Sequence, residues 1–304
     1  EFGETQAMLT IAEKMYGKYS WDRYDMLVLP PSFPFGGMEN PRLTFVTPTI
    51  LAGDRSLTSL VAHELAHSWS GNLVTNKTWD DFWLNEGFTV YFERRIMEQL
   101  EGIEYAEMLS LLGKQDLDDE IASLGKNHKD THLKLNLFGR DPDDGLTDVA
   151  YEKGFFLLRL IEGAVGRKQF DSFLKEYFSV NAFKVIDTEE FVAYLNTNLL
   201  NSRPKAKEKI RLEEWVYGAG IPDNCPKVKS TKFKAVESAI HSFEMGYPLA
   251  NIKSELWSSH EWLHFLRHLP KDIDIDDLKK LDIAFSFTNS GNSEILNAWF
   301  QLTI

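Results

Sequence analysis

The most informative residues of this chain are two histidines four positions apart, in His63-Glu64-Leu65-Ala66-His67. On a helix this spacing places both imidazoles on one side, because four residues turn the chain through about 400°. They can therefore bind one Zn²⁺, with Glu64 next to the metal as a general base for a water molecule. Glu86 follows His67 by 19 positions, which leaves room for a second helix to return and supply a third ligand. Three protein ligands leave one coordination position open, and this arrangement is typical of a catalytic zinc site.

The same five-residue pattern occurs a second time, in His260-Glu261-Trp262-Leu263-His264. At about 100° per residue, the apolar residues around this second copy fall opposite the histidines, which indicates a surface helix whose histidines face water. Around the first copy, apolar residues and alanines cover most of the helix circumference, so this helix is expected to be buried. Buried polar side chains need partners, and a metal with its water supplies them. We therefore predict that the first copy binds zinc and that the second binds no metal specifically.

Two acidic residues of the following helix can each be interpreted in two ways. Taken alone, Glu86 could equally be an exposed carboxylate, but the apolar run Phe82-Trp83-Leu84 favours a buried helix and therefore a ligand. Glu93 lies seven residues further along the same face. It can either hydrogen-bond a ligand imidazole or form an ordinary surface charge.

Residues Gly36-Gly37-Met38-Glu39-Asn40 form a glycine-containing segment with one acidic side chain. The two glycines expose backbone groups to an extended peptide, and Glu39 can hold a positively charged group. An ordinary hairpin turn with a solvated glutamate explains the same pattern and is favoured on pattern alone. Hydrolysis of a carbonyl compound also needs a group that stabilises the oxyanion. Spacing does not identify it, because Tyr151 is one of ten tyrosines.

The composition restricts the partners. The chain has 33 lysines and arginines against 46 aspartates and glutamates, a net charge of −13, and no basic stripe, so no nucleic-acid partner is expected. No apolar run reaches membrane-spanning length, so no membrane partner is expected either. The single cysteine, Cys225, excludes an intrachain disulfide and fits a reducing compartment. We expect a cytoplasmic monomer.

Periodicity and turn residues divide the chain into parts. The predicted strands are 24–29 and 43–47, and the predicted helices are 5–16, 56–70, 103–124, 151–165, 167–180 and 188–199. Asp54 or Ser56 is expected to cap the helix at 56–70, and a helix beginning near Asp81 carries Glu86. We predict a catalytic domain over 1–218, a linker over 219–231 and a helical C-terminal domain over 232–304. Both ends fall within helical patterns, so we expect a fragment of a longer protein.

Longer runs accompany these motifs: Leu29-Pro30-Pro31-Ser32-Phe33-Pro34, Gly71-Asn72-Leu73-Val74-Thr75-Asn76-Lys77-Thr78-Trp79 and Phe82-Trp83-Leu84-Asn85-Glu86-Gly87. Together they resemble the gluzincin zinc aminopeptidases, and within that family the leukotriene A4 hydrolase-like branch. The resemblance implies an α+β, mostly helical fold, in which a thermolysin-like zinc catalytic domain precedes an α-helical C-terminal domain. It also implies that the family's β-rich N-terminal domain and extreme C-terminus are missing from this sequence.

The resemblance assigns catalytic roles to individual residues. His63, His67 and Glu86 would hold one Zn²⁺ per chain. Glu64 would be the general base, and Tyr151 would donate its proton to stabilise the oxyanion.

It assigns substrate-binding roles as well. Glu39, with Gly36, Gly37 and Met38 beside it, would bind the free α-amino group of a peptide. Asp143 matches an acidic position that is associated with peptide cleavage in the leukotriene branch.

These residues predict a zinc-dependent aminopeptidase that removes the N-terminal residue of short peptides with a metal-activated water. Its partners would be peptides with a free N-terminus. One alternative is a bifunctional epoxide hydrolase and aminopeptidase of the leukotriene A4 hydrolase type, but the animal enzymes of that branch carry a tyrosine where this chain has Leu146. Another alternative is a non-catalytic scaffold, which would be expected to have lost Glu64 or a zinc ligand, whereas all are present.

Overall fold

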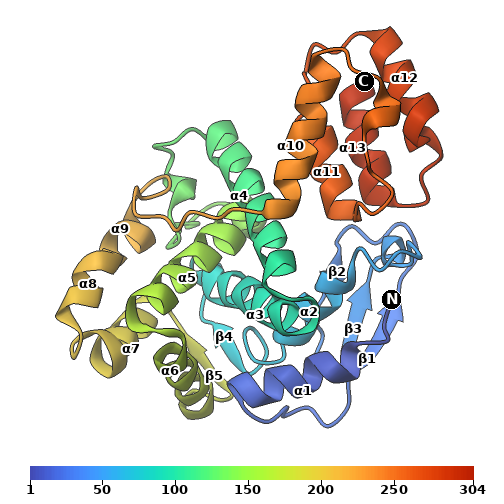
Figure 1. The fold of residues 1–304 in the computed structure, drawn as a ribbon. Coiled ribbons are helices and arrows are strands. Elements are labelled where there is room, and N and C mark those ends of the chain that lie inside the picture. The colour runs from blue at the N-terminus through green and yellow to red at the C-terminus, as the bar shows by residue number, and fades with distance from the viewer.

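The computed structural model describes all 304 residues, which form a mostly helical molecule with two small sheets (Figure 1). None of its helices is both long and apolar enough to cross a membrane. The α-helices are α1 (Thr5–Tyr16), α2 (Thr58–Ala66), α3 (Trp83–Glu101), α4 (Ile103–Leu124), α5 (Gly154–Val165), α6 (Arg167–Val180), α7 (Thr188–Leu195), α8 (Pro204–Ile210), α9 (Leu212–Tyr217), α10 (Thr231–Glu244), α11 (Ser259–Arg267), α12 (Ile275–Phe285) and α13 (Ser293–Thr303). The strands are β1 (Asp25–Val28), β2 (Gly37–Met38), β3 (Leu43–Val46), β4 (Val74–Asn76) and β5 (Lys184–Ile186).

Most of the predicted elements are present. The helices predicted at 5–16, 103–124 and 167–180 have the same bounds as α1, α4 and α6. The helix predicted at 151–165 begins with a π-helical turn, Val149–Lys153, which runs into α5. A second π-helical turn, Asn196–Leu200, ends the helix predicted at 188–199.

The helix that carries the first His-Glu-x-x-His copy is shorter than predicted. Leu57 occupies the N-cap position of α2, and its side chain makes no capping hydrogen bond. The prediction of Asp54 or Ser56 as cap is therefore wrong. Asp54 accepts hydrogen bonds from the Ser56 N–H at 3.0 Å and from the side chains of Ser259 and Asn292 at 3.0 and 2.8 Å. These last two donors are more than 200 residues away in sequence, so a local pattern does not contain them.

The three-stranded sheet carries the glycine segment. Its order is β1-β3-β2, with β1 parallel and β2 antiparallel to β3. Gly37 and Met38 pair with Val46 and Phe45 as an edge strand, and residues 39–42 connect this strand to β3 as a hairpin. This strand contacts α2, which brings Glu39 close to the helix that carries the histidines. The other sheet pairs β4 with β5 in parallel.

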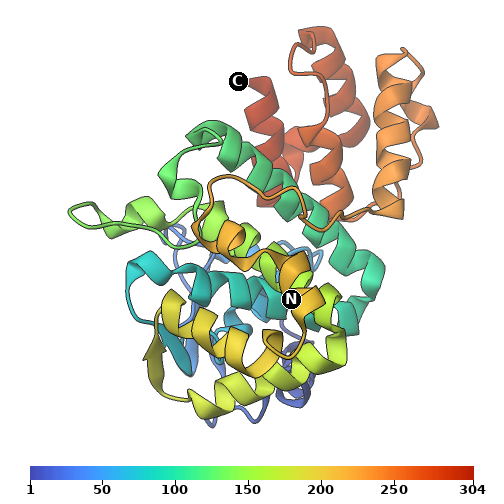
Figure 2. The ribbon, with the colours of Figure 1, turned by 90° about the vertical axis from the view of Figure 1, so that its left-hand side faces the viewer.

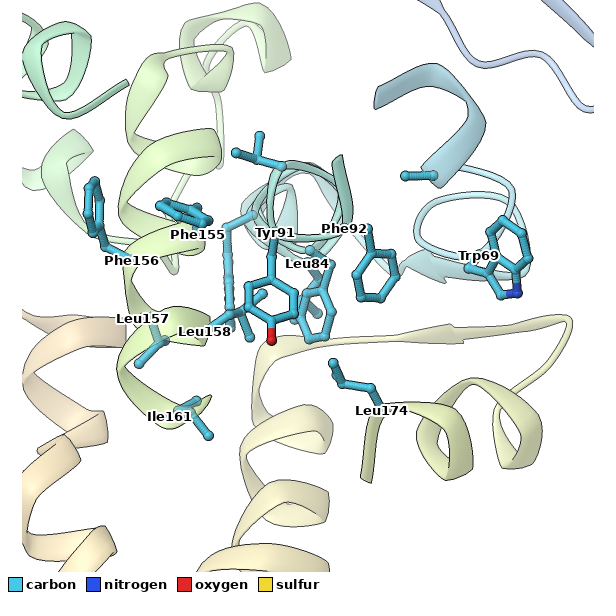
Figure 3. Packing of buried hydrophobic residues seen from close by; sticks show 14 of the residues in the cluster. Trp69, Leu84, Tyr91, Phe92, Phe155, Phe156, Leu157, Leu158, Ile161 and Leu174 are labelled. Carbon is cyan, nitrogen blue, oxygen red and sulfur yellow. The ribbon is translucent and has the colours of Figure 1, made fainter. Parts of the chain in front are cut away.

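Helix α3 lies at the centre of the larger part of the molecule. Fourteen of its 19 residues are buried, and α1, α2, α4 and α5 all pack against it. Figure 3 shows Tyr91 and Phe92 of this helix among side chains of the surrounding elements, such as Phe155, Trp69 and Leu174. Water cannot reach most faces of such a helix, so its polar residues need partners within the protein.

The buried apolar side chains form two separate clusters. The larger contains 47 residues and extends from α1 to α9. The smaller contains 13 residues and is built from the C-terminal helices together with Met108 and Leu112 of α4. Figures 1 and 2 show these C-terminal helices grouped at one end of the molecule, next to α4. Helix α4 is therefore the element on which the C-terminal helices dock.

The prediction that the second His-Glu-x-x-His copy faces water is wrong. On α11, His260 and His264 are only 7% and 2% exposed. His260 packs edge-on against Tyr105 of α4, with ring centroids 5.1 Å apart. His264 stacks on Phe233 of α10 at 4.1 Å, and its Nδ1 pairs with the Gln115 side chain at 3.1 Å. The histidine face of α11 is thus the face that packs on α4 and α10, which helical phase alone does not reveal.

We expect acid to weaken the docking of the C-terminal helices. Burial lowers the pKa of His260 to about 4, and burial with nearby His268 and Arg267 lowers that of His264 to about 3. Since an unfolded histidine has a pKa near 6.5, the unfolded chain binds more protons between pH 6.5 and about 4. The free energy of unfolding should therefore decrease as the pH is lowered through this window, by about 1.4 kcal/mol per pH unit for each histidine.

Thermal unfolding midpoints measured from pH 7 to pH 4.5 check this expectation. His264→Phe keeps an aromatic ring next to Phe233 but removes one titrating group, so its midpoint should fall less steeply than that of the wild type. His241→Phe is the matched control, because the His241 side chain is 73% exposed. Equal slopes in all three proteins would contradict the expectation.

Candidate metal centre

Three donor atoms from α2, its C-cap and α3 meet at one point. The Nε2 atoms of His63 and His67 are 3.2 Å apart, and Glu86 Oε2 lies 3.4 and 3.5 Å from them. A tetrahedral Zn²⁺ with bonds of about 2.1 Å separates its ligand atoms by about 3.4 Å. The three atoms therefore form one face of such a tetrahedron, and the fourth position is left for another ligand.

The remaining ring nitrogen of His63 is also held. His63 Nδ1 lies 3.1 Å from Glu93 Oε2, so an N–H at Nδ1 donates to the carboxylate and leaves the Nε2 lone pair for a metal. Of the two alternatives for Glu93, the structure has the hydrogen bond to the imidazole. The seven-residue spacing from Glu86 to Glu93 places both carboxylates on the side of α3 that faces α2.

The second imidazole is oriented in the same way. His67 Nδ1 is surrounded by three acceptors, Ser70 O at 3.0 Å, Thr89 Oγ1 at 3.1 Å and Asn85 Oδ1 at 3.2 Å. A proton at Nδ1 can donate to this group of acceptors, and the Nε2 lone pair then points to the shared position.

The charges of this cluster favour a cation. Burial by itself would lower the pKa of His67, but the carboxylates of Glu86 and Glu39 outweigh it and raise that pKa to about 9. Burial by itself would raise the pKa of Glu86, but the imidazoles of His67 and His63 lower it to about 2. Glu86 Oε2 is buried without a hydrogen-bond partner. A metal cation at this position supplies both the positive charge and the missing partner, so the donor set fits Zn²⁺.

Glu64 faces the same space from α2. Glu39, Glu64 and His67 present ligand atoms within 4.8 Å of one another. The missing side chain of Gly37 makes room for this carboxylate, because a Cβ atom at that position would overlap it. Glu64 Oε2 has no hydrogen-bond partner, and burial raises the pKa of Glu64 to about 7. The group is therefore a carboxylate that can exchange a proton near neutral pH.

Glu39 is held in place by two asparagines. Asn72 Nδ2 donates to the Glu39 backbone carbonyl at 2.7 Å, and Asn85 Nδ2 donates to Glu39 Oε1 at 3.2 Å. This carboxylate oxygen lies 3.8 Å from His67 Nδ1, and the Glu39 side chain is only 16% exposed. The alternative of a solvated glutamate in a turn therefore does not describe it.

Tyr151 lies over one of the imidazoles. Its ring is within 18° of parallel to that of His63 at a centroid distance of 6.2 Å, and it meets the edge of Phe82 at 5.9 Å. Burial, together with the carboxylates of Glu86 and Glu39, raises the pKa of Tyr151 above its usual range. The phenol therefore keeps its proton and can donate it to a hydrogen bond.

A glycine contact sets the distance between this tyrosine and α3. A Cβ atom on Gly87 would lie 2.7 Å from Gly154 Cα and 3.1 Å from the Ala150 carbonyl, so the two backbones touch. Gly87 directly follows Glu86, and Gly154 follows the π-helical turn that carries Tyr151. Any larger residue at either position would push the phenol away from the carboxylate.

The other predicted residues are exposed. A Cβ atom on Gly36 would lie 3.6 Å from Leu60 Cδ1 of α2, and Met38 is 38% exposed on the edge strand. Asp143 is exposed in a short 3₁₀ turn (Pro142–Gly145), and its carboxylate forms no hydrogen bond or ion pair. Leu146 follows this turn and is 37% exposed. The structure thus brings Glu39, but not Asp143, into contact with the histidine cluster.

Sequence reasoning missed Asn72 and Asn85, which connect Glu39 to the rest of the cluster. Asn85 alone contacts Glu39, Glu86 at 3.2 Å and His67 at 3.2 Å. A signal was present, because Asn85 precedes the predicted ligand in a helix predicted to be buried, where an amide needs partners. Asn72 has no such local signal.

Comparison with known proteins agrees with this geometry. Residues 1–213 match the model of the Peptidase family M1 domain, and residues 257–304 match that of the leukotriene A4 hydrolase C-terminal region. The chain is 42% identical over 318 aligned residues to leukotriene A-4 hydrolase of Xenopus laevis, covering all of this chain and 51% of that protein. It is 37% identical over 302 residues to leucine aminopeptidase 2 of Sclerotinia sclerotiorum, covering 98% of this chain and 50% of that protein.

A similar fold has been solved. The structure of yeast LTA4 hydrolase in complex with bestatin superimposes with a TM-score of 0.87 at 34% identity, covering 99% of this chain and 52% of that one. The chain thus spans about half the length of the relatives that it matches. The predicted fold class, an α+β and mostly helical catalytic region followed by α-helices, is confirmed.

We expect the chain to bind one Zn²⁺. His67→Ala should abolish stoichiometric binding, because two donors do not hold a catalytic zinc tightly. Asn85→Ala leaves the ligands in place but removes their support, and should weaken binding by about 10–100-fold. Chelator-competition titration measures both affinities, and circular dichroism controls for folding.

Glu64→Gln is the matched control for these variants. The substitution alters a buried carboxylate that faces the same space but is not one of the three converging donors. The variant should therefore bind one Zn²⁺ with nearly the wild-type affinity. Loss of the metal in Glu64→Gln, or its retention in His67→Ala, would contradict the proposed ligand set.

Proposed function

The chain belongs to peptidase family M1, and on that premise we propose that it is a zinc-dependent aminopeptidase that removes the N-terminal residue of short peptides. One observation carries this proposal. An oriented set of two imidazoles and a carboxylate lies next to a second, fixed carboxylate, with Glu39 Oε1 only 3.8 Å from His67 Nδ1. The partners of such an enzyme are peptides with a free N-terminus.

In this proposal His63, His67 and Glu86 hold one Zn²⁺. When bound, this ion supplies a Lewis acid that polarises the scissile carbonyl and lowers the pKa of water. The hydrogen bonds to both Nδ1 atoms keep the imidazoles in the ligand tautomer throughout the reaction. The buried position of α3 excludes bulk water from behind the ligands.

Glu64 acts as the general base. Its Oε2 atom has no hydrogen-bond partner in the protein, so it is free to accept a proton from the attacking water. The same oxygen then delivers that proton to the leaving amine. Gly37 is essential to this arrangement, because any side chain there would occupy the space of the carboxylate.

Glu39 and Tyr151 complete the site from two sides. The Glu39 carboxylate pairs with the α-ammonium group of the substrate, with Gly36, Gly37 and Met38 as the adjoining edge strand. The Tyr151 O–H donates a hydrogen bond to the oxyanion of the tetrahedral intermediate. Asp143 lies on the exposed turn outside this cluster, and we propose it only as a contact for the more distant part of a peptide.

We propose peptidase activity rather than epoxide hydrolase activity, although a relative carries the name leukotriene A-4 hydrolase. Leu146 is apolar and has no hydroxyl to assist epoxide opening. A non-catalytic scaffold would not need an unpartnered carboxylate next to the donor set.

We also propose the domain division 1–218, 219–231 and 232–304. The two separate hydrophobic clusters support it, as does the helix-free stretch between α9 and α10. A monomeric state and a cytoplasmic location stay predictions from the sequence.

The exopeptidase proposal predicts a strong preference for a free amine. Aminoacyl-p-nitroanilides should be hydrolysed, and their N-acetylated forms should react at least about 100-fold more slowly in kcat/KM. Glu39→Gln should lower kcat/KM for the free-amine substrate by about 10–100-fold, because a charge-assisted hydrogen bond contributes about 1.5–3 kcal/mol. Glu213→Gln, at an exposed position, is the control. Equal rates on free and acetylated substrates would refute the proposal.

The catalytic roles predict different kinetic signatures. Glu64→Gln should reduce kcat to background while zinc remains bound. Tyr151→Phe should lower kcat by about 100–1000-fold with little change in KM, because the lost donor acts on the transition state. An increase in KM alone for Tyr151→Phe would assign the phenol to substrate binding instead.

A further inference from the structure

Lys153 is a completely buried lysine that the proposed mechanism does not use. Its exposed fraction is 0%, and none of the ion pairs in the structure includes it. Its Nζ atom donates instead to two backbone carbonyls, Thr131 O and Gly218 O, each at 2.8 Å. Burial without a counter-charge is unfavourable for the charged form and lowers the pKa of this amine to about 7, and a methionine would fill the same space without that penalty. The polar contacts therefore need an explanation beyond packing.

These contacts join three segments that are far apart in sequence. Thr131 ends a 3₁₀ turn (Lys129–Thr131), and its hydroxyl accepts the N–H of Gly220 at 2.8 Å. Gly218 follows α9, at the point where the chain leaves for the C-terminal helices. Lys153 itself is the last residue of the π-helical turn. Its Nζ atom is thus the point where these segments meet.

The same π-helical turn carries Tyr151. Between the two residues lies Glu152, which forms a two-point ion pair with Arg94 of α3 at 2.7 and 2.5 Å. Glu152 fills the space above Gly113 of α4, where no Cβ atom would fit. The two residues that follow the tyrosine are therefore anchored to different parts of the protein. Glu152 is held by α3, and Lys153 is held by the backbone carbonyls of Thr131 and Gly218.

We propose that Lys153 is a positioning residue for Tyr151, which holds the π-helical turn against Thr131 and Gly218 and so fixes the direction of the phenol over His63. A π-helical turn interrupts the regular i→i+4 hydrogen bonds of an α-helix, and such single turns are frequent at functional sites. External anchors on two successive residues compensate for this. The inference rests on the proposed function, because it concerns the tyrosine that stabilises the oxyanion.

The proposal predicts that Lys153 acts through Tyr151. Lys153→Met removes both hydrogen bonds and should lower kcat on an aminoacyl-p-nitroanilide by about 10–100-fold, with KM and zinc content nearly unchanged. In a Tyr151→Phe background the same substitution should cause less than about a 2-fold further loss, because the affected group is already gone. Lys175→Met, an exposed lysine on α6, is the matched control and should behave as wild type in both backgrounds.

A merely structural role gives a different pattern. Lys153→Met would then lower kcat equally in both backgrounds, or reduce zinc content along with activity, and either result would overturn the proposal. If Lys153→Met does not fold, Thr131→Val removes the hydroxyl that accepts the Gly220 N–H and leaves the lysine in place. It should give the same kcat-selective loss, smaller in size and again absent in Tyr151→Phe; an equal loss in both backgrounds would overturn the proposal.

A readout without activity separates this inference from the proposed function. Hydrogen exchange followed by mass spectrometry should become faster in Lys153→Met for the amides of the π-helical turn at 149–153, while α2 and α3 keep their protection. Absence of aminopeptidase activity in the wild type would refute the proposed function and leave this measurement valid. Unchanged exchange at 149–153 would refute the positioning role alone.

Discussion

The mutual approach of three buried donor atoms is the constraint on which the rest of the site depends. Two imidazole nitrogens and a carboxylate oxygen lie 3.2 to 3.5 Å apart in the protein interior. Such a cluster is unfavourable unless a positive charge lies among its members, because burial removes the water that would otherwise solvate the carboxylate. The acceptors around both Nδ1 atoms hold the rings in the one tautomer that leaves their Nε2 lone pairs directed at the same position.

The buried helix α3 contributes residues to several parts of this site. Along its inner side it supplies Asn85 to the Glu39 carboxylate, Glu86 to the donor set and Glu93 to an imidazole. On another side, Gly87 lets the π-helical turn touch the helix, and Arg94 pairs with Glu152 of that turn. A helix exposed on one face could not do this, because half of these side chains would then point to water.

The C-terminal helices use the same local motif for a different purpose. In α11 the two histidines pack on Tyr105 and Phe233 and help join the helices to α4. In α2 the corresponding histidines face a carboxylate from α3. The same spacing therefore gives a packing surface in one helix and a candidate metal site in the other, and the neighbouring element decides between them.

By itself the sequence determined the helical periodicity, the fold class and the residues able to bind a metal. The periodicity and the donor residues follow from local spacing, such as the four-residue step between His63 and His67, whereas the fold class follows from the resemblance of the longer motifs to a known family. Local spacing could not decide which faces are covered. It placed the histidines of α11 in water and a cap at Asp54 or Ser56, and it missed Asn72, because in each case the partner comes from a distant segment. The approach of Glu39 to His67 and the anchoring of Lys153 were likewise decided only by tertiary structure, since burial and hydrogen-bond partners depend on which elements pack together.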